Sequence, residues 1–111
     1  MNAPKRATVK HFLLTYTLAP GYLERRAAFR TAHLAWARAA VERGELLLGG
    51  AVAGMGGEAP EQALLLFAGE DAGAAEAFAR ADPYVANGLV TAWRVLEWVT
   101  VVGDGAAQPV A

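Results

Sequence analysis

The pattern of apolar and polar positions along the chain predicts four strands and two helices. Runs rich in leucine, β-branched and aromatic residues predict strands at residues 9–17, 45–53, 61–68 and 89–102. A segment rich in Ala, Leu and Arg predicts a helix over residues 22–43, which Gly44 ends. A second helix begins at the N-cap Asp71, runs through Ala81 and ends before Pro83.

The order of these elements predicts the fold class. Strand, helix, strand, strand, helix, strand (βαββαβ) is the ferredoxin-like split βαβ arrangement of the α+β class. It places four strands in an antiparallel sheet with both helices on one face. Residues 46–48 and 64–67 are apolar at every position, so these strands should be buried on both faces. Two helices cover only one face, and we therefore expect a second copy of the chain, in a homodimer, to cover the other.

The length of the chain and the composition of its ends indicate the domain organisation. With 111 residues the chain is expected to form one domain, over residues 9–102. Residues 1–8 are interpreted as an N-terminal extension, and the Gly- and Pro-containing residues 103–111 as a flexible tail that need not pack. No apolar run follows Lys5 and Arg6, so we expect no signal peptide and a cytoplasmic protein.

Composition excludes several classes of protein and of site. Hydrophobic residues make up 55% of the chain and charged residues 19%, which excludes a disordered chain. The absence of Cys excludes a disulfide scaffold, a thiolate nucleophile and a cysteine zinc site. Two histidines without a metal-binding spacing predict no metal, and we expect no cofactor. A net charge of −1, a third strand without the RNA-binding motif and apolar runs shorter than ~18 residues predict neither a nucleic-acid nor a membrane partner.

Three polar residues of the first predicted helix interrupt its apolar side. At 100° per residue, Arg26, Arg30 and His33 share one face and point into the apolar arc. Arg38 falls on the opposite, polar side. Two interpretations of His33 remain open: a core histidine whose neighbouring arginines reach solvent, or an imidazole placed for acid–base chemistry. The other histidine, His11, is expected at the surface of the sheet.

Asp82 lies at the corner where the second predicted helix ends. The residue before a proline is driven out of the helical conformation, so the chain turns at Asp82. One interpretation is an N-cap, with Pro83 first in a short helical turn that Gly88 closes. The other is a site residue, because a carboxylate beside His33 would orient the imidazole and raise its pKa. A carboxylate has two oxygens, so the two roles are compatible.

Three segments taken together resemble one known family. They are Arg-Thr-Ala-His-Leu at residues 30–34, the glycine pair at residues 49–50, and Ala-Arg-Ala-Asp-Pro-Tyr-Val-Ala-Asn-Gly-Leu at residues 79–89. The first segment alone is a weak indication of the family, whereas the third is a more specific one. The two segments together, at this spacing, are quite specific. Together they resemble the YciI-like (YCII-related) family over roughly residues 9–101.

The resemblance implies both an assembly and a site. It implies a ferredoxin-like domain assembled as a dimeric α+β barrel, with a His–Asp site that falls on His33 and Asp82. Some relatives are dehydrochlorinases of chlorinated aromatic diols and quinols, and most members have no assigned reaction. The chain departs from the family at Ala51, where a proline often follows the glycine.

The enzyme hypothesis assigns a role to each of these residues. His33 would be the general base or acid, Asp82 its orienting partner, and Arg30 would hold an anionic or phenolate oxygen. The reaction would be proton abstraction with elimination, as in a dehydrochlorinase-type lyase, or isomerisation or hydrolysis of a small substrate. Aromatic residues would line an apolar pocket for a flat ring: Tyr16, Tyr84, Trp93 or Trp98. The alternative is a non-catalytic small-molecule-binding or interaction domain that forms a dimer.

Overall fold

The computed structural model describes residues 9–110. Its elements, in chain order, are strand β1 (Lys10–Leu18), helices α1 (Tyr22–Arg25) and α2 (Arg30–Glu42), strands β2 (Leu46–Val52) and β3 (Gln62–Gly69), helices α3 (Gly73–Ala81) and α4 (Pro83–Ala86), and strand β4 (Val90–Trp98). Short 3-10 turns lie at Arg26–Ala28 and Met55–Gly57. The predicted extension over residues 1–8 lies outside the described residues.

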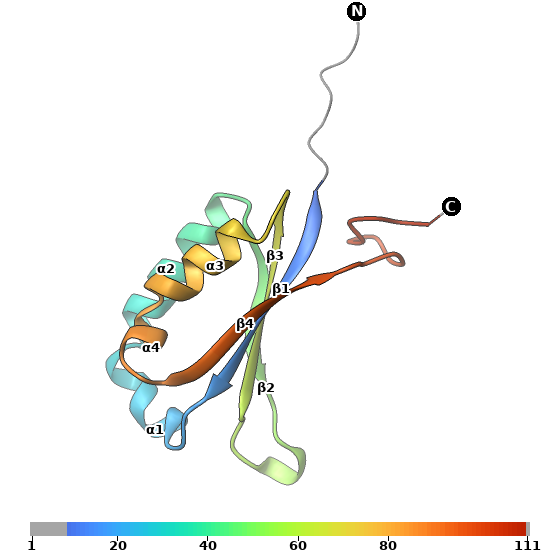
Figure 1. The fold of residues 1–111 in the computed structure, drawn as a ribbon. Coiled ribbons are helices and arrows are strands. Elements are labelled where there is room, and N and C mark those ends of the chain that lie inside the picture. The colour runs from blue at the N-terminus through green and yellow to red at the C-terminus, as the bar shows by residue number, and fades with distance from the viewer. Residues whose placement is uncertain (1–8, 111) are drawn as a thin grey trace, which may run out of the picture.

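The four strands form one antiparallel sheet in the order β2-β3-β1-β4. All helices lie against the same face of this sheet, as Figure 1 shows. The predicted ferredoxin-like α+β fold is therefore confirmed. The order also makes β2 and β4 the two edge strands, on opposite sides of the molecule.

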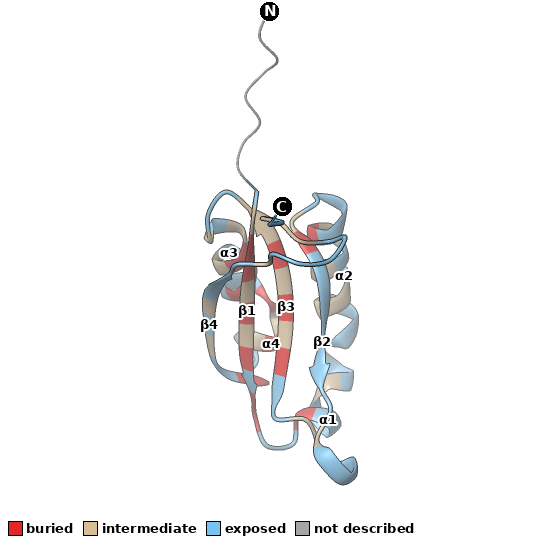
Figure 2. Cartoon of the chain, turned by 90° about the vertical axis from the view of Figure 1, so that its right-hand side faces the viewer, coloured by how far each residue is buried: buried red, intermediate tan, exposed pale blue. Residues whose placement is uncertain are grey.

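The core lies between the sheet and the helices. Alternate side chains of the two central strands are buried there, which appears as red bands along β1 and β3 in Figure 2. The strand residues of the core are Phe12, Leu14, Tyr16, Leu18, Leu46, Ala63, Leu65, Phe67 and Val90. The helices contribute small or aromatic side chains that pack against this face: Tyr22, Ala40, Ala75, Phe78, Ala79 and Tyr84.

The first helix is interrupted, so the prediction of one continuous helix is wrong. After α1 and a 3-10 turn, Phe29 has φ −119° and ψ −1°, and α2 begins at the next residue. The interruption lets Tyr22 pack into the core, edge-on to Tyr84 with 5.7 Å between ring centroids. Leu23, the next residue after Tyr22, remains 40% exposed. Gly44 has φ +77° and follows the last turn of α2 as predicted.

Asp71, the predicted N-cap of the second helix, lies one residue before the N-cap position. The Asp71 carboxylate accepts the Gly73 N–H at 2.8 Å, while Ala72 holds the N-cap position of α3. The last strand is shorter than the predicted residues 89–102: β4 ends at Trp98.

The C-terminal segment after β4 folds back on itself, on the side of the sheet that the helices leave free (Figure 1). The N–H groups of Gln108 and Val110 donate to the carbonyls of Thr100 and Val101, at 2.9 and 3.1 Å. Thr100 Oγ1 also lies 2.7 Å from His11 Nδ1, and His11 is only 5% exposed. The structure therefore differs from the expectation of a tail that need not pack and of a surface-exposed His11, because the segment covers this end of the sheet (Figure 2).

The sheet face opposite the helices, called the open face below, is apolar over most of its area. Its side chains come from all four strands, and the apolar ones include Leu13, Leu48, Val52, Leu64, Leu66, Leu96 and Trp98. Leu48 is 71% exposed and Leu96 is 45% exposed. None of the helices within residues 9–110 is long and apolar enough to cross a membrane.

Candidate active site

Asp82 is positioned by the turn between α3 and α4. It has an extended backbone, with φ −65° and ψ 125°, as expected for a residue before proline. Its Oδ1 accepts the N–H of Tyr84 at 2.9 Å, so Asp82 is the N-cap of α4 with Pro83 in the first turn. Gly88, at φ +76°, closes the turn that follows. The capping role predicted from the sequence is therefore present.

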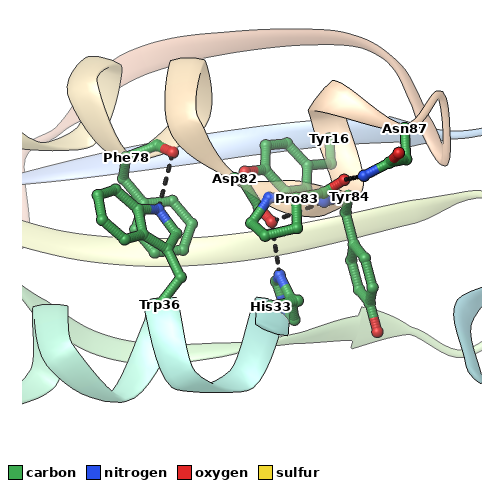
Figure 3. Close-up of polar contacts among 8 residues, drawn as sticks. All are labelled: Tyr16, His33, Trp36, Phe78, Asp82, Pro83, Tyr84 and Asn87. Atoms are coloured by element: carbon green, nitrogen blue, oxygen red, sulfur yellow. Dashed lines mark hydrogen bonds and ion pairs between the residues drawn. The ribbon is translucent and has the colours of Figure 1, made fainter. Parts of the chain in front are cut away.

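The same carboxylate contacts two further side chains from other elements. Oδ1 lies 2.8 Å from Nδ1 of His33, which α2 supplies, and Oδ2 accepts the hydroxyl proton of Tyr16 from β1 at 2.7 Å. Figure 3 shows Asp82 between these partners. The Asp82 side chain is fully buried, whereas that of His33 is 15% exposed. Three hydrogen-bond donors therefore reach this buried carboxylate, as a buried polar group requires.

These contacts determine which nitrogen of His33 is free to react. A carboxylate only accepts hydrogen bonds, so Nδ1 carries a proton and donates a hydrogen bond to Asp82. In the neutral imidazole Nε2 then has a free lone pair, and it has no hydrogen-bond partner among residues 9–110. The ring stacks on Tyr84, with 3.8 Å between centroids and 6° between planes, which holds its orientation.

Burial changes the acidity of two tyrosines in the site. It raises the pKa of Tyr16 far above its ordinary value of 10.0, and the negative charge and hydrogen bond of Asp82 raise it further. Tyr16 is therefore a permanent donor to the carboxylate. Burial also raises the pKa of Tyr84, while the positive charges of Arg30 and Arg26 act in the opposite direction.

A cavity of about 460 Å³ opens between α1, α2 and the edge strand β2. Its apolar surface comes from the core and from one side of α2, including Leu18, Ala63, Leu65, Leu34 and Ala37. Residues 46–51 of β2 form the opposite wall. The polar lining residues are Tyr16, Tyr22, Tyr84, His33, Arg26, Arg30 and Arg38.

The structure brings most of the predicted site residues together, with two exceptions. His33, Arg30, Tyr16 and Tyr84 line the cavity, and Asp82 lies directly behind His33. Trp93 and Trp98 do not line it. Both belong to β4, at the opposite edge of the sheet from β2. The Arg80 guanidinium carbon lies 5.8 Å from the centre of the Trp93 ring, and Trp98 is on the open face. In the single chain, therefore, neither predicted tryptophan contributes to this cavity.

Sequence reasoning also missed two cavity residues, Tyr22 and Arg38. Tyr22 is buried, so its apolar position does not distinguish it from a core residue. Arg38 lies about 140° around α2 from His33 and is exposed, as its polar position indicates, yet it also lines the open cavity. The spacing of Arg30, Leu34 and Arg38 at i, i+4 and i+8 is the signal that places them on one face of α2.

The described part of the chain contains no group of three or more His, Asp and Glu side chains that could hold a metal ion. The chemistry that these side chains can perform is proton transfer at Nε2 of His33, next to a space large enough for one substituted ring.

A sequence model of the YCII-related domain matches residues 10–99. No curated protein matches the chain. Among solved structures, the 5-chloro-2-hydroxyhydroquinone dehydrochlorinase from Burkholderia phenoliruptrix, in complex with 2,5-dihydroxybenzoquinone, has 26% identity and a TM-score of 0.68, covering 81% of this chain and 94% of that one.

Two further structures show similarity at the level of the fold. An antibiotic biosynthesis monooxygenase-like protein from Bacteroides thetaiotaomicron has 14% identity and a TM-score of 0.52, covering 87% of this chain and 93% of its own. A similar protein from Nitrosomonas europaea has 11% identity and a TM-score of 0.50, covering 86% and 93%.

Proposed function

This chain belongs to the YCII-related domain family, and we propose that it is a small-molecule enzyme in which His33 is the general base. The observation that carries this proposal is the 2.8 Å contact between His33 Nδ1 and Asp82 Oδ1 at the wall of the cavity. Asp82 holds the imidazole with its Nε2 lone pair available. When Nε2 accepts a proton, the buried carboxylate stabilises the positive charge that forms on the ring.

The proposed reaction is a dehydrochlorination or a related elimination from a hydroxylated ring. A cavity of about 460 Å³ accommodates one substituted ring, and three tyrosines together with apolar side chains surround it. Arg30 lies one helical turn before His33 and supplies a charged donor for an ionised ring oxygen. The dehydrochlorinase with 26% identity supports this reaction type.

The elimination of HCl from such a ring needs only one base, His33. In the keto tautomer of a chlorinated hydroquinone, the carbon next to the carbonyl is tetrahedral and carries both H and Cl. Nε2 of His33 takes the proton of the hydroxyl para to that carbonyl, and the oxygen electron pair forms a second C=O bond. The ring double bond shifts by one position and the C–Cl electron pair leaves as chloride. The products are a quinone, chloride and a proton on His33 that passes to solvent.

We also propose that the functional unit is a homodimer joined through the open face. The motive is the continuous apolar surface around Leu48, Leu66 and Leu96, on the face that no helix covers. Soluble monomers rarely expose apolar patches of more than a few hundred Å². A second copy presents the same apolar side chains, so a two-fold symmetric contact would cover the face in both copies.

Turnover of a defined compound tests the enzyme proposal. We expect the protein to release chloride from 5-chloro-2-hydroxyhydroquinone, and His33→Ala to lose roughly 10²–10⁴-fold in kcat/KM. The matched control is His11→Gln, which changes the other histidine, away from the cavity, and should keep its activity. A folded His33→Ala protein with unchanged turnover would contradict the assignment of the base.

The alternative of a non-catalytic binding domain gives a different pattern. In that case calorimetry detects binding of 2,5-dihydroxybenzoquinone, but the protein releases no chloride from 5-chloro-2-hydroxyhydroquinone. The variant Asp82→Asn keeps an N-cap and removes the charge, so the pKa of His33 measured by NMR should fall. An unchanged pKa would show that the pair does not function as a unit.

A further inference from the structure

The walls of the cavity are positively charged and contain no acid. Three arginines line it, Arg26, Arg30 and Arg38, and no Asp or Glu does. The carboxylate that contacts His33, Asp82, is fully buried and does not line the cavity. None of the three arginines forms an ion pair with an Asp or Glu of the described residues, whereas Arg43 and Arg80 do. Unpaired guanidinium groups beside an apolar surface favour an anionic ligand.

The arginines lie on both sides of the proposed base. Arg30 precedes His33 by three residues and Arg38 follows it by five, so their Cα atoms are about 12 Å apart at 1.5 Å per residue. Arg26 stands over the ring of Tyr22, 5.8 Å from its centroid, at the Arg30 end. The charges of Arg26 and Arg30 both reach the Tyr84 hydroxyl, where they oppose the effect of burial on its pKa.

We propose that the ligand of this cavity carries two ionised groups at opposite ends: an ionised ring oxygen at Arg26 and Arg30, and a carboxylate bound by Arg38. The position of the ring between them, at Nε2 of His33, rests on the proposed function. The planar guanidinium of Arg38 matches the two oxygens of a carboxylate, and one Arg balances one negative charge. The substrate class is therefore a hydroxylated aromatic acid.

The β2 wall of the cavity includes two residues that present backbone and no side chain. Gly49 and Gly50 of β2 line the cavity without side chains. By the strand register, a Cβ at Gly49 would point toward the helices and lie 3.4 Å from the Leu65 side chain, whereas one at Gly50 would point to the open face. Because β2 is an edge strand, alternate residues of it have N–H groups that no neighbouring strand uses. These groups are additional donors for an anionic ligand.

Binding of a matched pair of compounds tests the proposal. The probes are hydroquinone and 2,5-dihydroxybenzoate, which differ by one carboxylate, and calorimetry measures their dissociation constants. We expect the carboxylate to improve binding to the native protein by about ten- to hundredfold, as for a charge-assisted hydrogen bond. Arg38→Gln should remove this preference and leave hydroquinone binding unchanged. The control Arg80→Gln removes a charge outside the cavity and should keep the preference.

Two outcomes would overturn the proposal. One is equal binding of the two probes by the native protein. The other is a preference that survives in Arg38→Gln and disappears in Arg30→Gln, which would place the carboxylate at the other end. The same measurements on His33→Ala separate this inference from the proposed function, because carboxylate binding does not require the base. If the native protein prefers the probe with the carboxylate but releases no chloride from 5-chloro-2-hydroxyhydroquinone, the enzyme proposal is overturned and this inference stands.

Discussion

At the scale of single residues, the carboxylate of Asp82 connects three separate elements. Its donors come from β1, α2 and α4, through Tyr16, His33 and the backbone of Tyr84. Loss of a donor to a buried charged group costs about 1.5–3 kcal/mol. The site is therefore held together by the same contacts that contribute to the stability of the fold.

Tyr16→Phe tests the donor to Asp82 through its dependence on pH. The pKa of Tyr16 is raised in the folded protein, so this residue contributes most to stability below pH 10, where the unfolded chain also keeps the proton. Above pH 10 the unfolded chain ionises and the native state does not, so the free energy of unfolding falls with pH. In Tyr16→Phe this fall should be shallower by about 1.4 kcal/mol per pH unit between roughly pH 10.5 and 12, as measured by urea unfolding. Equal slopes in the two proteins would show that Tyr16 is not held protonated.

The partnership of His33 and Asp82 was predictable from the sequence, whereas the role of Tyr16 as a donor was not. The two partners stand in recognisable motifs, and the proline after Asp82 indicates a corner in the chain. Tyr16 was identified only as an aromatic residue for a pocket. Its hydroxyl reaches Asp82, 66 positions away in sequence, because the strand register directs it toward the helices. Contacts over such separations depend on the packed structure and leave no local pattern.

At the scale of elements, the one-turn helix α4 presents Asp82 to the site. It spans only Pro83–Ala86, and its exit depends on Gly88 in a left-handed conformation, at φ +76°. From there the chain enters β4 directly, with the Leu89 N–H donating to the Tyr84 carbonyl at 2.9 Å. Such a short helix has little stability of its own, so its two ends determine its position.

Gly88→Ala is expected to lower the free energy of unfolding by about 1–2 kcal/mol, because a residue with Cβ is strained at positive φ. In a domain of this size that corresponds to a fall in Tm of roughly 4–8 °C per kcal/mol. Gly105→Ala is the control, since this glycine has ordinary φ and open space around it. Thermal unfolding with the same Tm for both variants would contradict this account of the turn.

The strands were predictable to within a few residues, while the interruption of the first helix was not. The strand predicted at residues 9–17 lies at Lys10–Leu18, because an apolar run is a local property. The break at Phe29 contains neither proline nor glycine, and it serves contacts between Tyr22 and Tyr84 that form only in the folded chain. Arg38 escaped detection for another reason: it is an exposed arginine on the polar side of α2, about 140° around the helix from His33.

At the scale of the whole molecule, the two faces of the sheet have separate roles. The helix-covered face holds the core, and the cavity lies at its β2 edge. The open face presents apolar side chains, with the C-terminal segment against one end at His11. A second copy on the open face would therefore leave the cavity walls formed by α1 and α2 accessible.

Leu96→Glu tests whether the open face joins two copies. Leu96 is half-exposed in the single chain, so a charge there has little effect on folding, but it would be buried without a partner in the dimer. We expect the native protein to sediment as a dimer at micromolar concentration and Leu96→Glu as a monomer. Leu23→Glu, at a similarly exposed position on α1, is the control and should remain dimeric. A native protein that sediments as a stable folded monomer would exclude this interface.

The double use of Asp82 has a consequence for how this lineage evolves. His33 contributes chemistry from a partly exposed position, whereas Asp82 also caps α4 and accepts the hydroxyl of the buried Tyr16. If the reaction ceases to matter to the organism, selection on His33 relaxes, but substitutions of Asp82 still harm folding. The two residues are therefore expected to disappear in a set order. Descendants that retain the aspartate without the histidine would be proteins that have given up catalysis, and the reverse combination should be rare.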